Sequence, residues 1–263
     1  MVIGNNEPGF FRQNIPAIST PVFLPFIIPT GGNTTLASDV TLFDKTISLT
    51  SATGFGPGSF AGVFSGVSGE GRFYFGTQIG VSVGNDITLD TPLDFAFSAT
   101  DPVVAFSKEM LVDGSTTPQT FQVRAGGVGS STYLLINRII IAMTTFSAPT
   151  LSDFGDGSAL VEGLVFRVNN GIVRNLNNIK SNQAFVNWGF DFNFYSVLGG
   201  TDGLGGRVTW AGEDKHGTPL LLAPSDALEC IVQENITGNA LSLSIIAEGR
   251  EVPQSYLRFF GVT

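Results

Sequence analysis

The strongest constraint on the fold is a series of short apolar segments with strand periodicity in residues 133–248, separated by turns rich in glycine and asparagine. Residues 160–168 form one such segment, and Asn170-Gly171 follows it, a dipeptide that accepts the positive φ angles of a two-residue hairpin. Long segments with apolar residues spaced by three and four are missing, although residues 152–164 could hold one short helical turn. The pattern predicts an all-β chain that is rich in packing signals and poor in reactive groups.

The most hydrophobic of these segments, residues 133–143, is rich in β-branched side chains, which favours a central strand over a buried helix. Upstream, residues 79–83 and 87–89 flank the turn Gly84-Asn85-Asp86 and predict a hairpin. Residues 120–124 alternate as a half-buried strand does. Frequent short strands of this kind predict a β-sandwich or jelly-roll-like fold, in one domain or in two β subdomains.

Proline sets the organisation of the N-terminal region. Pro16, Pro21, Pro25 and Pro29 interrupt the apolar residues 15–29 and exclude a membrane-spanning helix, so that an extended arm is expected. Packing on its own domain and packing on a neighbouring subunit would cover the apolar side chains of this arm equally well. We therefore expect an arm over residues 1–35, a first β subdomain over 36–125, a β-sandwich over 132–251 and an apolar tail over 252–263, with the boundary in the glycine-rich residues 126–131.

Composition limits the partners of this chain. Only 13% of the residues are charged, against roughly 25% in soluble domains, and the net charge is −9. A low charged fraction favours a subunit that neighbours partly cover, because charged residues are depleted at the centre of interfaces. The negative charge argues against nucleic acid and anionic membrane surfaces, since phosphate binding requires Lys and Arg. The N-terminus lacks the pattern of a secretory signal, so we expect none.

Candidate catalytic groups are few. His216 is the only histidine and lies in a polar turn, where a solvated side chain is expected rather than a general base. Cys230 lies inside an apolar strand, which predicts an inert core thiol, and a single cysteine excludes an intramolecular disulfide. The acidic turn at Asp153 lacks the ligand series of an EF-hand and reads as an ordinary turn, while cation binding there stays open. We predict no catalytic residue, no cofactor and no metal site; a glycoside hydrolase with two facing carboxylates is the enzymatic alternative.

A set of stretches distributed over the chain carries a family resemblance: residues 87–97, 112–115, 118–119, 137–143, 159–167, 179–185 and 228–233. As a set, they resemble a widespread family of structural proteins from tailed-bacteriophage particles. The resemblance covers most of residues 73–249 and departs at Glu234-Asn235, where relatives carry two aspartates, and at Glu248-Gly249-Arg250, which replaces a Gly-His ending. It implies a virion component without known catalysis.

Taken together, these features predict a non-enzymatic structural protein of a tailed-phage particle, which folds in the bacterial cytoplasm and enters the virion as capsid decoration, neck or tail. Its expected partners are copies of itself in a symmetric homo-oligomer and other virion proteins. The alternative is a receptor- or glycan-binding module of a phage fibre, with Trp188, Tyr195 and Trp210 as candidate rings for sugar stacking. The predicted assembly contacts are apolar residues of the arm and tail: Val22, Phe23, Leu24, Phe26, Ile27, Ile28, Tyr256, Leu257, Phe259 and Phe260.

Overall fold

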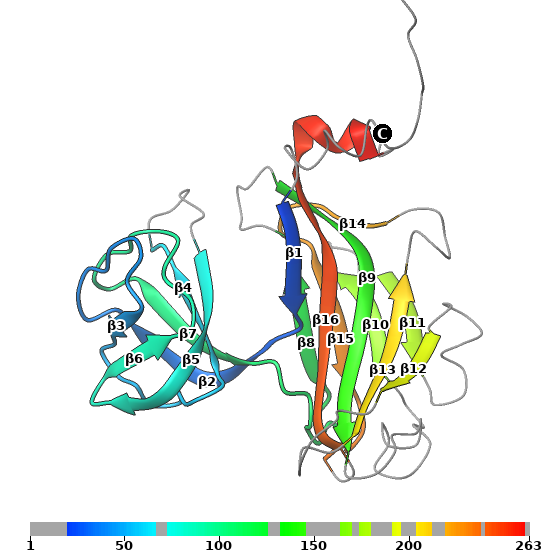
Figure 1. Cartoon of the computed structure of the whole chain (residues 1–263), viewed down its shortest axis with the longest axis horizontal. Helices are drawn as coiled ribbons and strands as arrows, with labels where there is room; N and C mark the ends of the chain where they lie inside the picture. The colour runs from blue at the N-terminus through cyan, green and yellow to red at the C-terminus, as the bar shows by residue number, and fades with distance from the viewer. Residues whose placement is uncertain are drawn as a thin grey trace, which may run out of the picture.

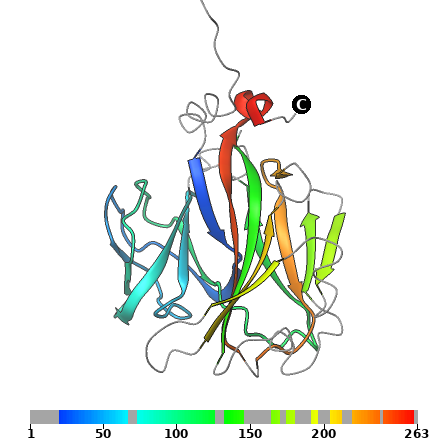
Figure 2. The same cartoon turned by 45° about the vertical axis from the view of Figure 1, so that its right-hand side comes forward.

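A computed structural model describes residues 20–66, 73–125, 132–145, 164–169, 174–179, 191–195, 204–211, 219–237 and 240–260. These residues form β-strands and one 3₁₀ helix, η3 (Gln254–Phe260), and the described strand pairs are antiparallel. Figure 1 shows a β-sandwich with a smaller β body beside it, and the view in Figure 2 keeps the two bodies distinct. The prediction of an all-β fold with a β-sandwich is confirmed.

The sandwich is built from two facing sheets. The first has the order β1-β16-β9-β13-β12, with β14 also paired to β9, and the second has the order β11-β10-β15-β8. The predicted central strand is confirmed as β9, which lies in the middle of the first sheet. The strands are β1 (Thr20–Pro25), β8 (Gln119–Arg124), β9 (Thr132–Thr145), β10 (Leu164–Asn169), β11 (Arg174–Ile179), β12 (Asp191–Tyr195), β13 (Leu204–Ala211), β14 (Leu220–Leu222), β15 (Ala227–Val232) and β16 (Ala240–Pro253).

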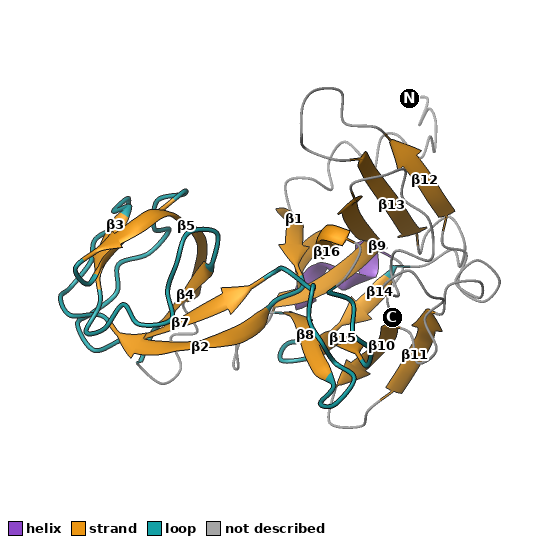
Figure 3. Cartoon of the chain, turned by 90° about the horizontal axis from the view of Figure 1, so that it is seen from below, coloured by secondary structure: helices purple, strands orange, loops and turns teal. Residues whose placement is uncertain are grey.

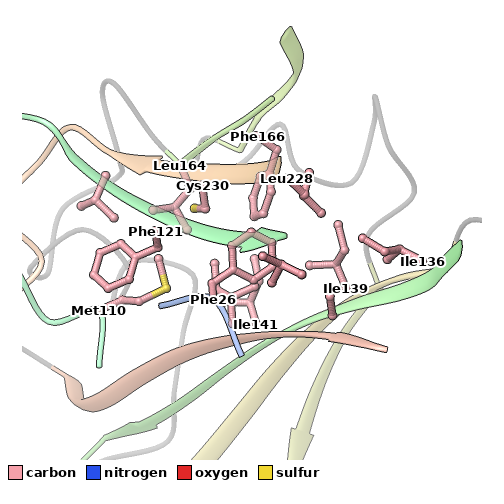
Figure 4. Close-up of a cluster of buried hydrophobic side chains, with 14 of the residues drawn as sticks. Phe26, Met110, Phe121, Ile136, Ile139, Ile141, Leu164, Phe166, Leu228 and Cys230 are labelled. Atoms are coloured by element: carbon pink, nitrogen blue, oxygen red, sulfur yellow. The ribbon is translucent and has the colours of Figure 1, made fainter. Parts of the chain in front are cut away.

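The core of the sandwich lies between these two sheets (Figure 4). Ile139 and Ile141 reach it from β9, and Phe166 and Cys230 reach it from β10 and β15. The Phe26 ring packs edge-on against the Phe166 ring, with the centroids 5.9 Å apart. Cys230 is fully buried, as predicted, and burial raises the pKa of its thiol far above the usual range, so the thiol stays protonated.

A β-bulge keeps the long strand β9 facing the core along its whole length. The register against β16 shifts between Glu248 and Gly249, so that Leu134 and Ile136 before the shift and Ile139 after it all join the core. Gly249 is required at this point because a Cβ atom there would collide with the carbonyl oxygen of Leu135. The bulge is therefore fixed by a glycine that no other residue could replace without moving a strand.

The smaller body is a closed barrel. Its sheet has the order β2-β7-β4-β5-β6-β3, and a bridge between Leu36 and Leu49 joins the two outer strands, with Ala37 N donating to Ser48 O at 2.8 Å. The closed sheet encloses a second core. The predicted hairpin around Gly84 and Asn85 is confirmed between β5 and β6. The strands are β2 (Ile28–Thr35), β3 (Thr46–Ser48), β4 (Phe60–Phe64), β5 (Phe73–Val83), β6 (Asp86–Leu89) and β7 (Pro102–Ser107).

The barrel is inserted into the sandwich between β1 and β8, so two crossings connect the bodies (Figure 3). In the first crossing, Phe26 N donates to Ile245 O of the first sheet at 2.8 Å, and Ile27 then pairs with Gln122 of the second sheet. In the second crossing, the Glu109 carboxylate accepts the N–H of Leu243 at 2.7 Å. Both crossings are therefore tied to the sandwich by hydrogen bonds.

This insertion differs from the expected division of the chain. Residues 20–35 of the expected extended arm form strands β1 and β2, which pair within the chain, and β8 belongs to the sandwich although it precedes the expected boundary. Residues 126–131 lie outside the described residues, and the strands on either side of them, β8 and β9, are both in the sandwich. The expected tail begins as the end of β16 and continues as η3. A glycine-rich segment marks a loop inside a domain as readily as a linker, which explains the misplaced boundary.

Replacing Phe26 with alanine would remove the ring that packs between the sheets at the first crossing. We expect the free energy of unfolding to fall by about 3–5 kcal/mol, as for other buried Phe→Ala changes, measured by urea denaturation. Phe23→Ala is the matched control, because Phe23 is 70% exposed and should change stability by less than about 0.5 kcal/mol. Equal losses in the two variants would contradict the placement of Phe26 in the core.

Glu251 provides a pH test of the sandwich. It pairs with the buried Leu134, whose side chain shares its face of the sheet, and burial raises the pKa of the Glu251 carboxyl. Because the fold disfavours the ionised form, stability is lost as pH rises from the unfolded-state pKa through the raised folded-state pKa. Glu251→Gln should therefore raise Tm near neutral pH and leave it unchanged at about pH 3. Calorimetry at both pH values checks this; an equal shift at each would contradict it.

Candidate assembly surfaces

The residues predicted to make assembly contacts from the arm divide into buried and exposed groups. Phe26 is fully buried in its own chain, so its prediction as an intermolecular contact is wrong, because the crossing places it between the sheets. Val22, Leu24 and Ile28 are partly buried against the same core. Phe23 is the exception on β1, since its side chain points away from the core and stays 70% exposed.

The prolines of β1 have a structural role at the edge of the first sheet. Phe26 N bonds to Ile245 O in the register that β1 keeps against β16, so Pro21, Phe23 and Pro25 occupy the alternate positions whose backbone nitrogens point away from β16. Proline has no N–H, which leaves Phe23 as the outward donor between the two prolines. The edge is thereby poorly suited to adding another strand, and Phe23 offers its ring as the main contact.

The remaining predicted residues lie near the C-terminal end of the described chain. Tyr256 is exposed and Leu257 partly buried, both in η3. Phe259 and Phe260 belong to η3 as well, but their side chains lie outside the described part, and Ile27 is half-buried beside β8. His216, the acidic turn at Asp153 and Trp188 lie outside the described residues. Tyr195 and Trp210 lie in β12 and β13, and their side chains are likewise outside the description.

An aromatic cluster covers the outer face of the barrel over β4, β5 and β7. Phe64, Phe75 and Phe106 pack edge-to-face, with ring centroids 5.5–6.4 Å apart. They meet above Gly62, where a Cβ atom would come within 2.8 Å of both Phe75 and Phe106. The rings thus fill the space that the glycine leaves, and most of their surface is already used within the chain.

A second apolar group, here called the barrel tip, consists of Leu42, Phe43 and Phe95. Residues 40–44 and 93–97 run antiparallel: Val40 exchanges both backbone hydrogen bonds with Phe97, and Phe43 N donates to Leu93 O at 3.0 Å. This alignment places Leu42 opposite Phe95. Leu42 is 47% exposed, Phe43 is 73% exposed and Phe95 is 43% exposed.

The barrel tip is held by a tight turn over residues 41–44. Asp44 N donates to Thr41 O at 3.2 Å, and the Asp44 carboxylate accepts both the N–H and the hydroxyl of Thr41, at 2.6 and 3.0 Å. Phe43 has a φ of 73° at the third turn position, where type II turns take glycine. A bulky side chain in this left-handed conformation is strained, which marks the turn as a candidate functional feature.

A shallow hollow lies on the surface of the barrel. It is lined by Phe55, Ser82 and Asn85, among others. Phe55 packs against the barrel core, and the Asn85 amide donates to Thr50 O at 3.2 Å. These engagements leave little of an aromatic platform or of free amide groups, so the hollow fits glycan binding less well than the barrel tip fits a protein contact.

Charged pairs lie on the outer faces of the sandwich. Arg167 of β10 bonds the carboxylate of Glu229 on β15, directly across the strands, and Arg138 pairs with Glu248 at 3.0 Å. Within the described residues, His, Cys, Asp and Glu form no cluster that could hold a metal ion. No helix in the described part of the chain is long and apolar enough to cross a membrane.

The barrel tip was missed in the sequence, although a signal for the turn exists. Thr41 and Asp44 are spaced three residues apart, as in turns closed by an aspartate side chain. The apolar residues Leu42 and Phe43 between them favour a strand over a turn, because the third position of a type II turn normally carries glycine or asparagine. The exposure of the tip is a property of the closed barrel in the tertiary structure, and the local sequence does not show it.

Replacing Phe43 with glycine should stabilise the protein. Glycine adopts a φ of 73° without strain, so we expect the free energy of unfolding to rise by about 1 kcal/mol, measured by urea denaturation. Leu42→Gly is the control in the same turn, and it should lower stability by about 0.5–1 kcal/mol because no positive φ favours glycine there. A loss of stability in Phe43→Gly equal to that in Leu42→Gly would contradict the assigned strain.

No protein-family model matches this sequence, and no curated protein matches it. Among the described residues, the exposed apolar groups at Phe23, at Tyr256 and at the barrel tip are the candidate functional features.

Proposed function

We propose that this chain is a non-enzymatic structural subunit of a tailed-phage particle, which assembles with copies of itself and with other particle proteins. The observation that carries the proposal is the exposure of large apolar side chains on a protein whose described residues already form two buried cores. Phe23 and Phe43 are each at least 70% exposed. Burying such groups against a neighbour gains about 25 cal/mol per Å² of apolar surface, which their own fold does not obtain.

The distribution of these groups supports a subunit with more than one contact. Phe23 and Tyr256 belong to the sandwich, whereas Leu42, Phe43 and Phe95 belong to the barrel. A chain with apolar groups on both bodies can touch a different neighbour with each. The two hydrogen-bonded crossings favour this use, because they tie the barrel to the sandwich at two points.

The setting is supported by the sequence. The low charged fraction suits a subunit that is partly covered by neighbours, and the resemblance of residues 73–249 to structural proteins of tailed-phage particles favours a virion. In this proposal the chain folds in the bacterial cytoplasm and is then built into the particle. The blunted edge of β1 favours contacts through side chains such as Phe23 over the addition of strands.

The test combines particle composition with one surface variant. Quantitative mass spectrometry of purified particles of the phage that encodes the chain should find it in a fixed copy number. Phe23→Ser should unfold at the same urea concentration as the parent chain, while its copy number per particle falls about tenfold or more, as for the loss of a central aromatic contact.

Val83→Ser is the matched control, because Val83 is 81% exposed on the hairpin of the barrel and its loss should leave the copy number unchanged. Particles that contain none of the chain would overturn the proposal as a whole. A normal copy number with Phe23→Ser would overturn the assignment of the β1 edge as an assembly contact.

A further inference from the structure

We propose that the barrel tip of Leu42, Phe43 and Phe95 docks into an apolar recess bordered by lysine and arginine side chains on a different protein. The inference deepens the assembly function and rests on it for the setting. The contact itself is argued from the exposure, rigidity, strain and charge of the tip.

The barrel tip is held rigidly by contacts within the chain. The Asp44 carboxylate holds the turn from inside through two bonds to Thr41, and the Phe95 ring packs edge-on against the buried Phe97, with the centroids 6.5 Å apart. Lys45 adds a further tie by donating to Asp90 O at 3.0 Å. The tip is therefore presented in one conformation, so little conformational entropy is lost when a partner covers it.

The backbone of the barrel tip is strained at Phe43. Phe43 occupies a conformation that glycine would adopt more easily, and its ring is 73% exposed, so the residue contributes little to the core. Strained positions cluster at functional sites, so a strained position that carries an exposed aromatic side chain is a candidate contact residue. Aromatic side chains are also among the commonest central contacts of protein interfaces.

Charge identifies the kind of partner. The two segments of the tip, residues 39–45 and 90–97, contain Asp39, Asp44, Asp90 and Asp94 against a single basic residue, Lys45. An apolar centre within an acidic border is complementary to a recess with a basic border, because complementary potentials steer and orient association. The same border repels an anionic membrane.

A second copy of the chain fits this surface poorly. An isologous contact would bring two acidic borders together, and a chain with a net charge of −9 has a surplus of acidic residues to offer. Three side chains also cover less than the roughly 800 Å² per partner that a stable interface buries. The tip is thus suited to serve as one anchor within a larger contact to another protein.

The test uses the purified full chain and a fluorescein-labelled amphipathic helical peptide of leucine and lysine, which presents an apolar stripe with a basic border. Two control peptides are compared with it: in one, glutamate replaces every lysine, and in the other, serine replaces every leucine. Fluorescence anisotropy should show that each control peptide binds the protein about tenfold or more weakly than the leucine–lysine peptide. Phe43→Gly, the variant expected to be more stable than its parent, should weaken binding of the leucine–lysine peptide about tenfold or more. Asp94→Lys should weaken it by reversing a border charge, and Val83→Ser should leave it unchanged.

Equal binding of the three peptides, or unchanged binding by Phe43→Gly, would overturn the proposal. So would sedimentation showing a dimer that Phe43→Gly dissociates, since a second copy would then occupy the tip. Binding to phosphatidylcholine–phosphatidylglycerol vesicles that depends on Phe43 would overturn it in favour of a membrane. These outcomes are independent of particle composition, so failure of the docking inference and failure of the phage setting are separable.

Discussion

The rest of the structure depends on the first crossing, where the chain passes from one sheet of the sandwich to the other within three residues. Phe26 bonds to Ile245 in the first sheet and places its ring against Phe166, and Ile27 then pairs with Gln122 in the second sheet. This passage links the two sheets at one point and leads the chain into β2 of the barrel. The second crossing, through Glu109 and Leu243, returns the chain to the same side. The barrel is consequently an insertion held at two points rather than a domain on a single linker.

The two bodies solve the problem of exposed sheet edges in different ways. The barrel closes on itself through the bridge between Leu36 and Leu49, whereas the β1 edge of the sandwich stays open and carries Pro21 and Pro25 at the positions facing outward. Both solutions suppress uncontrolled strand pairing. In the proposed assembly, recognition would fall to side chains such as Phe23 and Phe43, which allow specific contacts without exposing backbone groups.

The predictions that succeeded depend on local signals. The β-branched content of residues 133–143 identified the central strand β9, the Gly84-Asn85 turn identified the β5–β6 hairpin, and the apolar neighbours of Cys230 identified a core thiol. The predictions that failed depend on long-range pairing. The prolines of residues 20–35 indicated extended backbone correctly, but their spacing cannot show that β1 pairs with a strand more than 200 residues away, at Ile246 to Glu251. The hypotheses on His216, Asp153 and Trp188 concern residues outside the described structure and stay predictions.

By itself the sequence determined an all-β protein of short antiparallel strands, an extended proline-containing N-terminal region and a chain poor in charge, because periodicity, proline and composition act on neighbouring residues. The tertiary structure alone decided which strands pair, that the barrel is inserted between β1 and β8, and which apolar residues are used internally. Phe26 and Phe23 illustrate the division: they are three residues apart and chemically identical, yet one is fully buried and the other exposed. The physical reason is that burial depends on which partner strand lies opposite, and that choice is made by contacts between residues far apart in the chain.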